Sequence, residues 1–167
     1  MQATWILVAD RVRARLFAAD TNGDSLTELQ DLVNPDGRHP EAPYAHDRPP
    51  RAIESVGGAR HAIEPHTTPE EKASTRFAQD LHDVLERGRV DHRYERLILA
   101  AAPGFLGDLR QHLGKQVRAC VVAEMDKDLT TLPATEIAER LQPLLRSCSA
   151  ASLRTGAAAR ARRGWPA

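Results

Sequence analysis

Two short apolar runs constrain the fold of this 167-residue chain more than any other feature. Thr4–Ala9 and Arg96–Ala102 are apolar at almost every position, without the alternation typical of a strand that has one face in water. Such runs fit strands that are buried on both faces of a sheet. The chain is therefore expected to place these two strands near the centre of a layered α/β fold.

The residues after the first run predict two more strands. Arg13–Ala18 and Ser25–Val33 are separated by Thr21-Asn22-Gly23-Asp24, which has the composition of a tight turn. Leucines recur every three residues in the second segment, and this spacing also fits a helix. We favour three strands in an antiparallel meander.

Thr68-Pro69-Glu70-Glu71 predicts the start of a long helix. Thr68 supplies the N-cap, Pro69 fits the first helical position and Glu71 completes a capping box. The helix is expected to run to about Arg87 and to stop at Gly88. Its apolar face consists of Ala73, Phe77, Leu81, Val84 and Leu85.

The second half of the chain alternates between strand and helix patterns. After the run that ends at Ala102, Pro103-Gly104 opens a short helix that ends at Gly114. Val117–Glu124 is a predicted strand, and Pro133 opens a last helix. Short connections between such elements imply parallel strands and right-handed crossovers. The prediction is an α/β sandwich of about five strands, a meander followed by βαβα, with three helices.

Regular patterns are absent from Asn34 to Thr68. Seven of the eleven prolines lie between Pro35 and Pro69, and four of the seven histidines lie in the same stretch. An irregular loop of this length is usually functional or disordered. The histidine spacings match no zinc pattern, so no metal is predicted here. No cofactor is predicted for the chain either. We predict one domain over residues 1–146, with loop 34–68 inside it, and a disordered basic tail over residues 147–167.

Charge is distributed unevenly along a chain whose net charge is zero. Residues 1–139 hold 17 basic and 23 acidic groups, and residues 140–167 hold six arginines and no acid. An acidic body does not favour general nucleic-acid binding. No apolar run predicts a membrane span or a secretory signal, and Cys120 and Cys148 make no disulfide framework. We expect a cytoplasmic protein without a membrane partner.

Five segments in fixed order carry a family resemblance. They are WILVADRVRARLF at 5–17, GGARHAIEP at 57–65, FAQDL at 77–81, LILAAAPGFLGDLRQHL at 97–113 and VVAEMDKDLT at 121–130. Together they resemble the bacterial host-attachment family, proteins described as required for attachment to host cells, over residues 4 to about 145. That family is similar to the middle domain of the archaeal and eukaryotic class-1 peptide-chain release factor and of its ribosome-rescue relative. This similarity implies an RNase H-like sandwich.

The resemblance also implies a role for the loop before the long helix. In the release factor this loop carries Gly-Gly-Gln and promotes hydrolysis of peptidyl-tRNA. Gly57 and Gly58 match the two glycines by position, whereas Ala59 stands where the glutamine would be. Because a methyl group cannot form the hydrogen bonds that position a water, no catalytic residue is predicted. The rescue relative, which also lacks the motif, is the closer analogy.

Three functions remain open. The first is a non-enzymatic module associated with the ribosome, rRNA or tRNA, whose RNA contacts would come from Gly57, Gly58, Arg60, His61, Arg38, Arg48 and Arg51. The second is a factor in attachment to a host cell, acting directly or indirectly. The third and least favoured is a metal-dependent nuclease that uses Asp10, Asp126 and Asp128. A homo-oligomer is compatible with the sequence, but no exposed apolar stripe requires one.

Overall fold

A computed structural model describes residues 3–20, 23, 25–37 and 68–161 of the chain. The exposure of side chains is described for these residues as far as Cys148. Its five strands form one sheet: β1 (Thr4–Ala9), β2 (Arg13–Ala19), β3 (Leu26–Val33), β4 (Arg96–Ala101) and β5 (Val121–Met125). The strand order is β3-β2-β1-β4-β5. β2 lies antiparallel to β1 and β3, whereas β4 lies parallel to β1 and β5. The predicted meander and the predicted parallel half are both confirmed.

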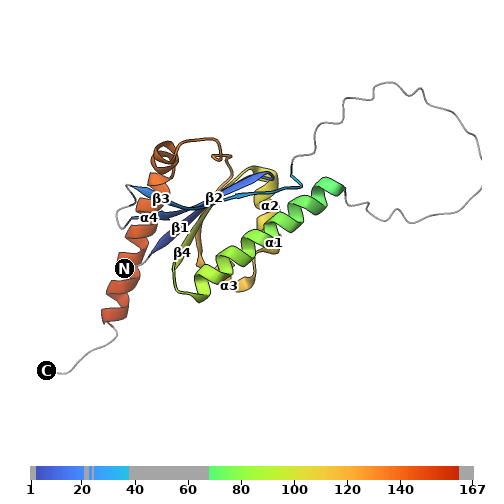
Figure 1. Ribbon diagram of the computed structural model, residues 1–167. Helices are drawn as coiled ribbons and strands as arrows, with labels where there is room; N and C mark the ends of the chain where they lie inside the picture. Colours follow the sequence, from blue (N-terminus) through green and yellow to red (C-terminus); the bar gives the residue numbers. More distant parts are fainter. Residues whose placement is uncertain (1–2, 21–22, 24, 38–67, 162–167) are drawn as a thin grey trace, which may run out of the picture.

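Among the described residues, four helices cover the two faces of the sheet (Figure 1). They are α1 (Pro69–Val90), α2 (Pro103–His112), α3 (Lys115–Cys120) and α4 (Ala134–Ala161). Helices α1, α2 and α3 pack on one face, and α4 packs on the other. The α/β class is confirmed, with one helix more than predicted.

The central strands explain the two apolar runs. Every residue of β1 is buried, as are all residues of β4 after Arg96. Trp5 and Leu7 face the core beneath α1, whereas Ile6 and Val8 face the core beneath α4. Because both faces of these strands are covered, neither strand shows alternation between apolar and polar residues.

The predicted start of α1 is confirmed, but its predicted end is wrong. The Thr68 hydroxyl accepts the N–H of Glu71 at 3.1 Å, and the Glu71 carboxylate accepts the N–H of Thr68 at 2.8 Å. Gly88 does not stop the helix, which continues to Val90. A methyl group on Gly88 would lie 2.3 Å from atoms of the Trp5 indole. Glycine therefore serves here for close packing against Trp5 rather than for a turn.

His92 provides the left-handed residue that ends α1, with φ +53°. Its N–H donates to the carbonyl of Arg89, and the N–H of Arg93 donates to the carbonyl of Gly88. This pattern is a Schellman motif, in which glycine is the usual residue at the left-handed position.

Replacing His92 with glycine is expected to raise the free energy of unfolding by about 0.5–1 kcal/mol, because the left-handed conformation is strained when a Cβ is present. Asp91→Gly is the matched control, since Asp91 has φ −78°. There glycine brings only its entropic cost and should lower the free energy of unfolding. Urea denaturation measures both variants, and a less stable His92→Gly variant would contradict this account of the helix end.

The strand predicted at Val117–Glu124 begins only at Val121, because Lys115–Cys120 forms α3. Val117 is buried in the core beneath α1. Residues 117 and 121 share a face both in a strand and, four residues apart, on a helix, so alternation alone could not distinguish the two. Cys120, predicted inside an apolar strand, is the last residue of α3 and is half-buried.

Helix α4 begins at Ala134, close to the predicted start, and continues to Ala161. Residues 147–161, predicted as part of a disordered tail, are thus helical. The prediction weighed their small apolar content but not the high helix propensity of alanine, leucine and arginine. The domain boundary at residue 146 stays a prediction, and residues 162–167 lie outside the described part. No helix within the described residues is long and apolar enough to cross a membrane.

Candidate functional site

The predicted RNA-contact residues lie outside the described part of the chain, which excludes residues 38–67. Their roles therefore stay predictions. These residues are Gly57, Gly58, Arg60, His61, Arg38, Arg48 and Arg51. The structure does describe the support from which this segment departs and to which it returns, namely Asn34–Gly37 and the start of α1.

Asn34 is the centre of this support and is 4% exposed. Its side-chain amide donates to the carbonyl of Arg11 at 2.8 Å and to the carbonyl of Ala73 in α1 at 3.4 Å. Its own N–H donates to the carbonyl of Val12 at 2.7 Å. One side chain thus joins the β1–β2 turn, the end of β3 and the first turns of α1. These elements flank residues 38–67.

The chain passes tightly over the β1–β2 turn just before residue 38. The N–H of Gly37 donates to the carbonyl of Asn34, and a Cβ on Gly37 would lie 2.6 Å from the carbonyl oxygen of Arg11. Asp36 forms an ion pair with Arg76 of α1 at 3.1 Å. Because both side chains are more than half exposed, this pair adds little stability. Buried Asn34, rather than the ion pair, fixes the support.

Arg11 supplies a cation at the support. It lines a small cleft together with Asn34, Asp36, Gly37, Glu70 and Ser74. Its guanidinium also lies beside the start of α2, since a Cβ on Gly104 would be 3.3 Å from Nη2. Arg11 is exposed, and within the described ranges its guanidinium makes no hydrogen bond or ion pair.

Two of the three acids of the nuclease hypothesis, Asp10 and Asp128, contact the same residue beyond the carboxyl ends of β1 and β5. The Thr130 hydroxyl lies 2.9 Å from Oδ2 of Asp10 and 2.7 Å from Oδ1 of Asp128. Asp10 also accepts the N–H groups of Val12 and Arg13, and Asp128 accepts the N–H of Thr130. These local bonds are of the kind that shapes turns.

Asp126, the third acid of that hypothesis, contributes to neither set of bonds. The hydrogen bond to Glu124 raises the pKa of the nearby Arg110 guanidinium, and the charge of Asp126 adds to this effect in a smaller way. Among the residues that the structure describes, no three His, Cys, Asp or Glu side chains are grouped to hold a metal ion. A nuclease site at Asp10, Asp126 and Asp128 stays a prediction.

The two cysteines lie apart from these acids. Burial raises the pKa of the Cys120 thiol and of the Cys148 thiol, which favours the protonated form over the nucleophilic thiolate.

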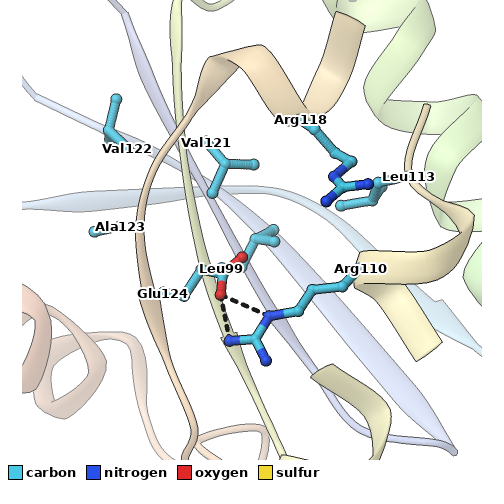
Figure 2. A pocket seen from close by; sticks show the side chains of 8 residues that line it. All are labelled: Leu99, Arg110, Leu113, Arg118, Val121, Val122, Ala123 and Glu124. Carbon is cyan, nitrogen blue, oxygen red and sulfur yellow. Dashed lines mark hydrogen bonds and ion pairs between the residues drawn. The ribbon is translucent and has the colours of Figure 1, made fainter. Parts of the chain in front are cut away.

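A second concave site lies at the β5 edge of the sheet (Figure 2). This cavity of about 350 Å³ is lined by Leu99, Arg110, Leu113, Arg118, Val121, Val122, Ala123 and Glu124. Two nitrogens of Arg110 donate to Oε2 of Glu124, at 2.8 and 2.5 Å. Sequence reasoning missed this site because Arg110, Arg118 and Glu124 come from three elements and form no motif.

Sequence reasoning also missed two structural residues. Asn34 begins Asn34-Pro35-Asp36-Gly37, whose composition signals a turn but not its contact with a helix 39 residues later. His82, which had no predicted role, accepts the N–H of Gly114 at Nδ1 over 3.3 Å and so holds the start of α3.

Comparison with known proteins identifies a family and similarity to solved structures, two of which are described below. The family model described as "Protein required for attachment to host cells" matches residues 5–141. No curated protein matches the chain.

Among solved structures, the chain is similar to one described as an archaeal protein, at 12% identity and a TM-score of 0.45. That match covers 94% of this chain and 41% of the other. It is also similar to the Ppx/GppA phosphatase of Aquifex aeolicus, at 12% identity and a TM-score of 0.40, covering 75% and 35%. The chain thus spans about two fifths or less of the length of these proteins.

Proposed function

Because this chain belongs to the family of proteins required for attachment to host cells, we propose that it serves attachment as a binding module. In this proposal residues 38–67 contact an RNA backbone, and the ribosome is the expected partner. The role in attachment is then indirect and is exerted from the cytoplasm. The task of the module is contact rather than hydrolysis, because Ala59 stands in place of the glutamine that release factors use.

The observation that supports this proposal is the support centred on Asn34. This residue ties together the elements on both sides of residues 38–67, through bonds to Arg11, Val12 and Ala73. A binding segment held at both ends by a rigid scaffold loses less conformational freedom when it meets its partner. The sheet and its helices then serve to present this segment.

The charges of the segment are suited to phosphate. Arg60 and His61 follow the two glycines directly, and Arg48 and Arg51 precede them. Arginine donates two parallel hydrogen bonds to a phosphate group, and glycine lets a backbone approach closely. Exposed Arg11 adds a further cation on the support itself.

The fold has a place in the same proposal. We place the meander and the βαβα half in the RNase H-like arrangement of the release-factor middle domain. There, too, the binding loop precedes the long helix that corresponds to α1. The resemblance of the segments at 57–65 and 77–81 supports this correspondence.

Arg60→Ala is expected to weaken co-sedimentation of the full chain with bacterial ribosomes about fivefold at moderate salt, and to lower the salt dependence of binding by about one phosphate contact. The physical reason is the loss of one guanidinium that displaces counterions from RNA. Binding is measured by pelleting ribosomes through sucrose at a series of salt concentrations. Arg140→Ala is the matched control, since Arg140 is exposed on α4 and lies 3.9 Å from Glu136.

Two results would contradict the proposal. One is wild-type protein that does not pellet with ribosomes in a salt-sensitive way. The other is an Arg60→Ala variant that behaves like Arg140→Ala. Fractionation of cells adds a separate readout, because protein found at the cell surface would support a direct part in attachment instead.

A further inference from the structure

The edge of the sheet formed by β5 is open in the part of the chain that the structure describes. β5 is the last strand in the order β3-β2-β1-β4-β5, so one of its sides pairs with no other described strand. Its pairing with β4 shifts register between Leu97 and Ile98, and this shift leaves Val122 without a partner on β4. Val122 is 44% exposed, and Figure 2 shows its side chain pointing away from Leu99. Unpaired backbone groups at such an edge are a template for another strand.

The cavity at this edge, here called the β5 groove, consists of Leu99, Arg110, Leu113, Arg118 and Val121–Glu124. Its apolar part is formed by Leu99 and Leu113, both nearly fully buried, and by Val121. Four consecutive strand residues line it, so the groove runs along the strand and offers backbone as well as side chains. Its volume of about 350 Å³ lies at the lower end of the range for binding pockets.

One charged residue of the groove, Arg118, favours an acidic occupant, because the charge of Arg110 is balanced by Glu124. Arg110 forms an ion pair with Glu124 through two of its nitrogens, and the negative charge of Asp126 also acts on it. Arg118, which is exposed on α3, forms no ion pair or hydrogen bond through its side chain with any described residue. Arg118 and Leu113 both line the groove, and Figure 2 shows the guanidinium of Arg118 overlapping Leu113 in this view. A guanidinium that has no partner among the described residues, in a groove with an apolar floor, matches an apolar group that is followed by a carboxylate.

We propose that the β5 groove binds an extended segment of a partner protein, in which an aliphatic residue lies next to an acidic one. The segment adds a strand to the free edge of β5. Its aliphatic side chain lies over Leu99, Leu113 and Val121, and its carboxylate accepts hydrogen bonds from Arg118. Strand addition of this kind takes affinity from backbone bonds and specificity from side-chain pockets. None of its lining residues belongs to 38–67, and the proposal does not depend on RNA binding.

Two labelled hexapeptides of one pattern test the proposal by fluorescence anisotropy with the full chain. The acidic peptide DVLVDV is expected to bind at least about tenfold more tightly than the basic peptide KVLVKV, as charge-assisted hydrogen bonds imply. A DVLVDV peptide that is N-methylated at alternate backbone nitrogens cannot donate to a strand ladder and should lose this binding.

Variants of the chain locate the site. Arg118→Glu should reverse the preference between the two peptides, whereas Arg146→Glu, an equal charge change on exposed α4, should leave it unaltered. Arg60→Ala should also leave the preference for the acidic peptide unaltered. Peptide binding and ribosome binding are therefore tested independently. Circular dichroism checks that each variant retains its fold.

Four outcomes would overturn the proposal. Equal binding of the acidic and basic peptides removes the role of Arg118. Unchanged binding of the N-methylated peptide shows a site that does not bind a strand. Complete displacement of DVLVDV by isobutyrate shows a site for a small apolar anion instead. A dimer that Val122→Lys dissociates, with no peptide binding, assigns the edge to a second copy of the chain.

Discussion

Gly88→Ala is expected to lower the free energy of unfolding by about 3 kcal/mol, at the upper end of the range for overpacked cores. The added methyl group would lie 2.3 Å from Cζ3 and Cη2 of Trp5. The indole has little room to move, because its ring stacks on Tyr94 at a centroid separation of 4.7 Å and lies beneath the guanidinium of Arg93. Helix α1 would therefore have to shift away from β1. Urea denaturation measures the effect.

Gly107→Ala is the matched control for this prediction. Gly107 is also a glycine inside a helix, but a Cβ there would have no atom within 4 Å. Its replacement should raise the free energy of unfolding by up to about 1 kcal/mol, because alanine favours helix. In a double variant, Trp5→Leu should relieve part of the Gly88→Ala penalty. Equal stability of Gly88→Ala and Gly107→Ala would refute the contact with Trp5.

Arg15→Met is expected to lower the free energy of unfolding by about 3 kcal/mol, because it removes a buried cation with several partners. Arg15 donates from Nε and Nη2 to the two oxygens of Glu28, at 3.1 and 2.7 Å. It also donates to the carbonyl of Leu132 at 2.6 Å, and its guanidinium lies over the Phe17 ring. Loss of Arg15 would leave the Leu132 carbonyl without this hydrogen-bond donor and would detach the loop between β5 and α4 from β2. Thermal and urea unfolding measure the effect.

Arg13→Met is the control for Arg15→Met. Arg13 lies on the same strand and forms a comparable pair with Asp31 of β3, but both side chains are about two fifths exposed. An exposed pair is expected to contribute less than about 1 kcal/mol. The two variants differ chiefly in burial. Equal losses of stability would contradict the role given to Arg15.

The pH dependence of stability offers a second readout for the same variant. The hydrogen bond from Arg15 is the largest cause that holds the pKa of Glu28 below its usual value of 4.5. A carboxyl group with a lowered pKa stabilises the fold above its unfolded pKa, and this contribution is lost as the pH falls through the folded pKa. Arg15→Met should therefore lose less stability than the wild type on going from about pH 5 to about pH 3. A steeper loss would contradict this sign.

The sequence was most informative where a local pattern had only one physical reading. The runs at 4–9 and 96–101 required cover on both faces, and the capping box of Thr68 and Glu71 needed only its own four residues. Family membership followed from segments in fixed order, and the family model matches residues 5–141. The prediction failed where the reason for a residue lay elsewhere in the chain. Gly88 is explained by Trp5, which lies 83 positions earlier.

The candidate sites show the same limit. Residues 57–61 stood out as a motif, yet they lie outside the described residues. The support built on Asn34 and the β5 groove are described but carry no motif, because their parts meet only in the folded chain. The pairing of Arg110 with Glu124, for example, joins α2 to β5 across 14 positions. A local pattern cannot predict a contact that depends on how a helix crosses a sheet.

The cover on the second face of the sheet comes last in the chain. Ile6, Val8 and Phe17 are synthesised well before the helix that shields them, which begins only at Ala134. During synthesis, this face stays uncovered until α4 has emerged. A chain that stops before Ala134 would leave these apolar side chains open to water and to other nascent chains. Truncated products are thus expected to aggregate or to need a chaperone until α4 arrives.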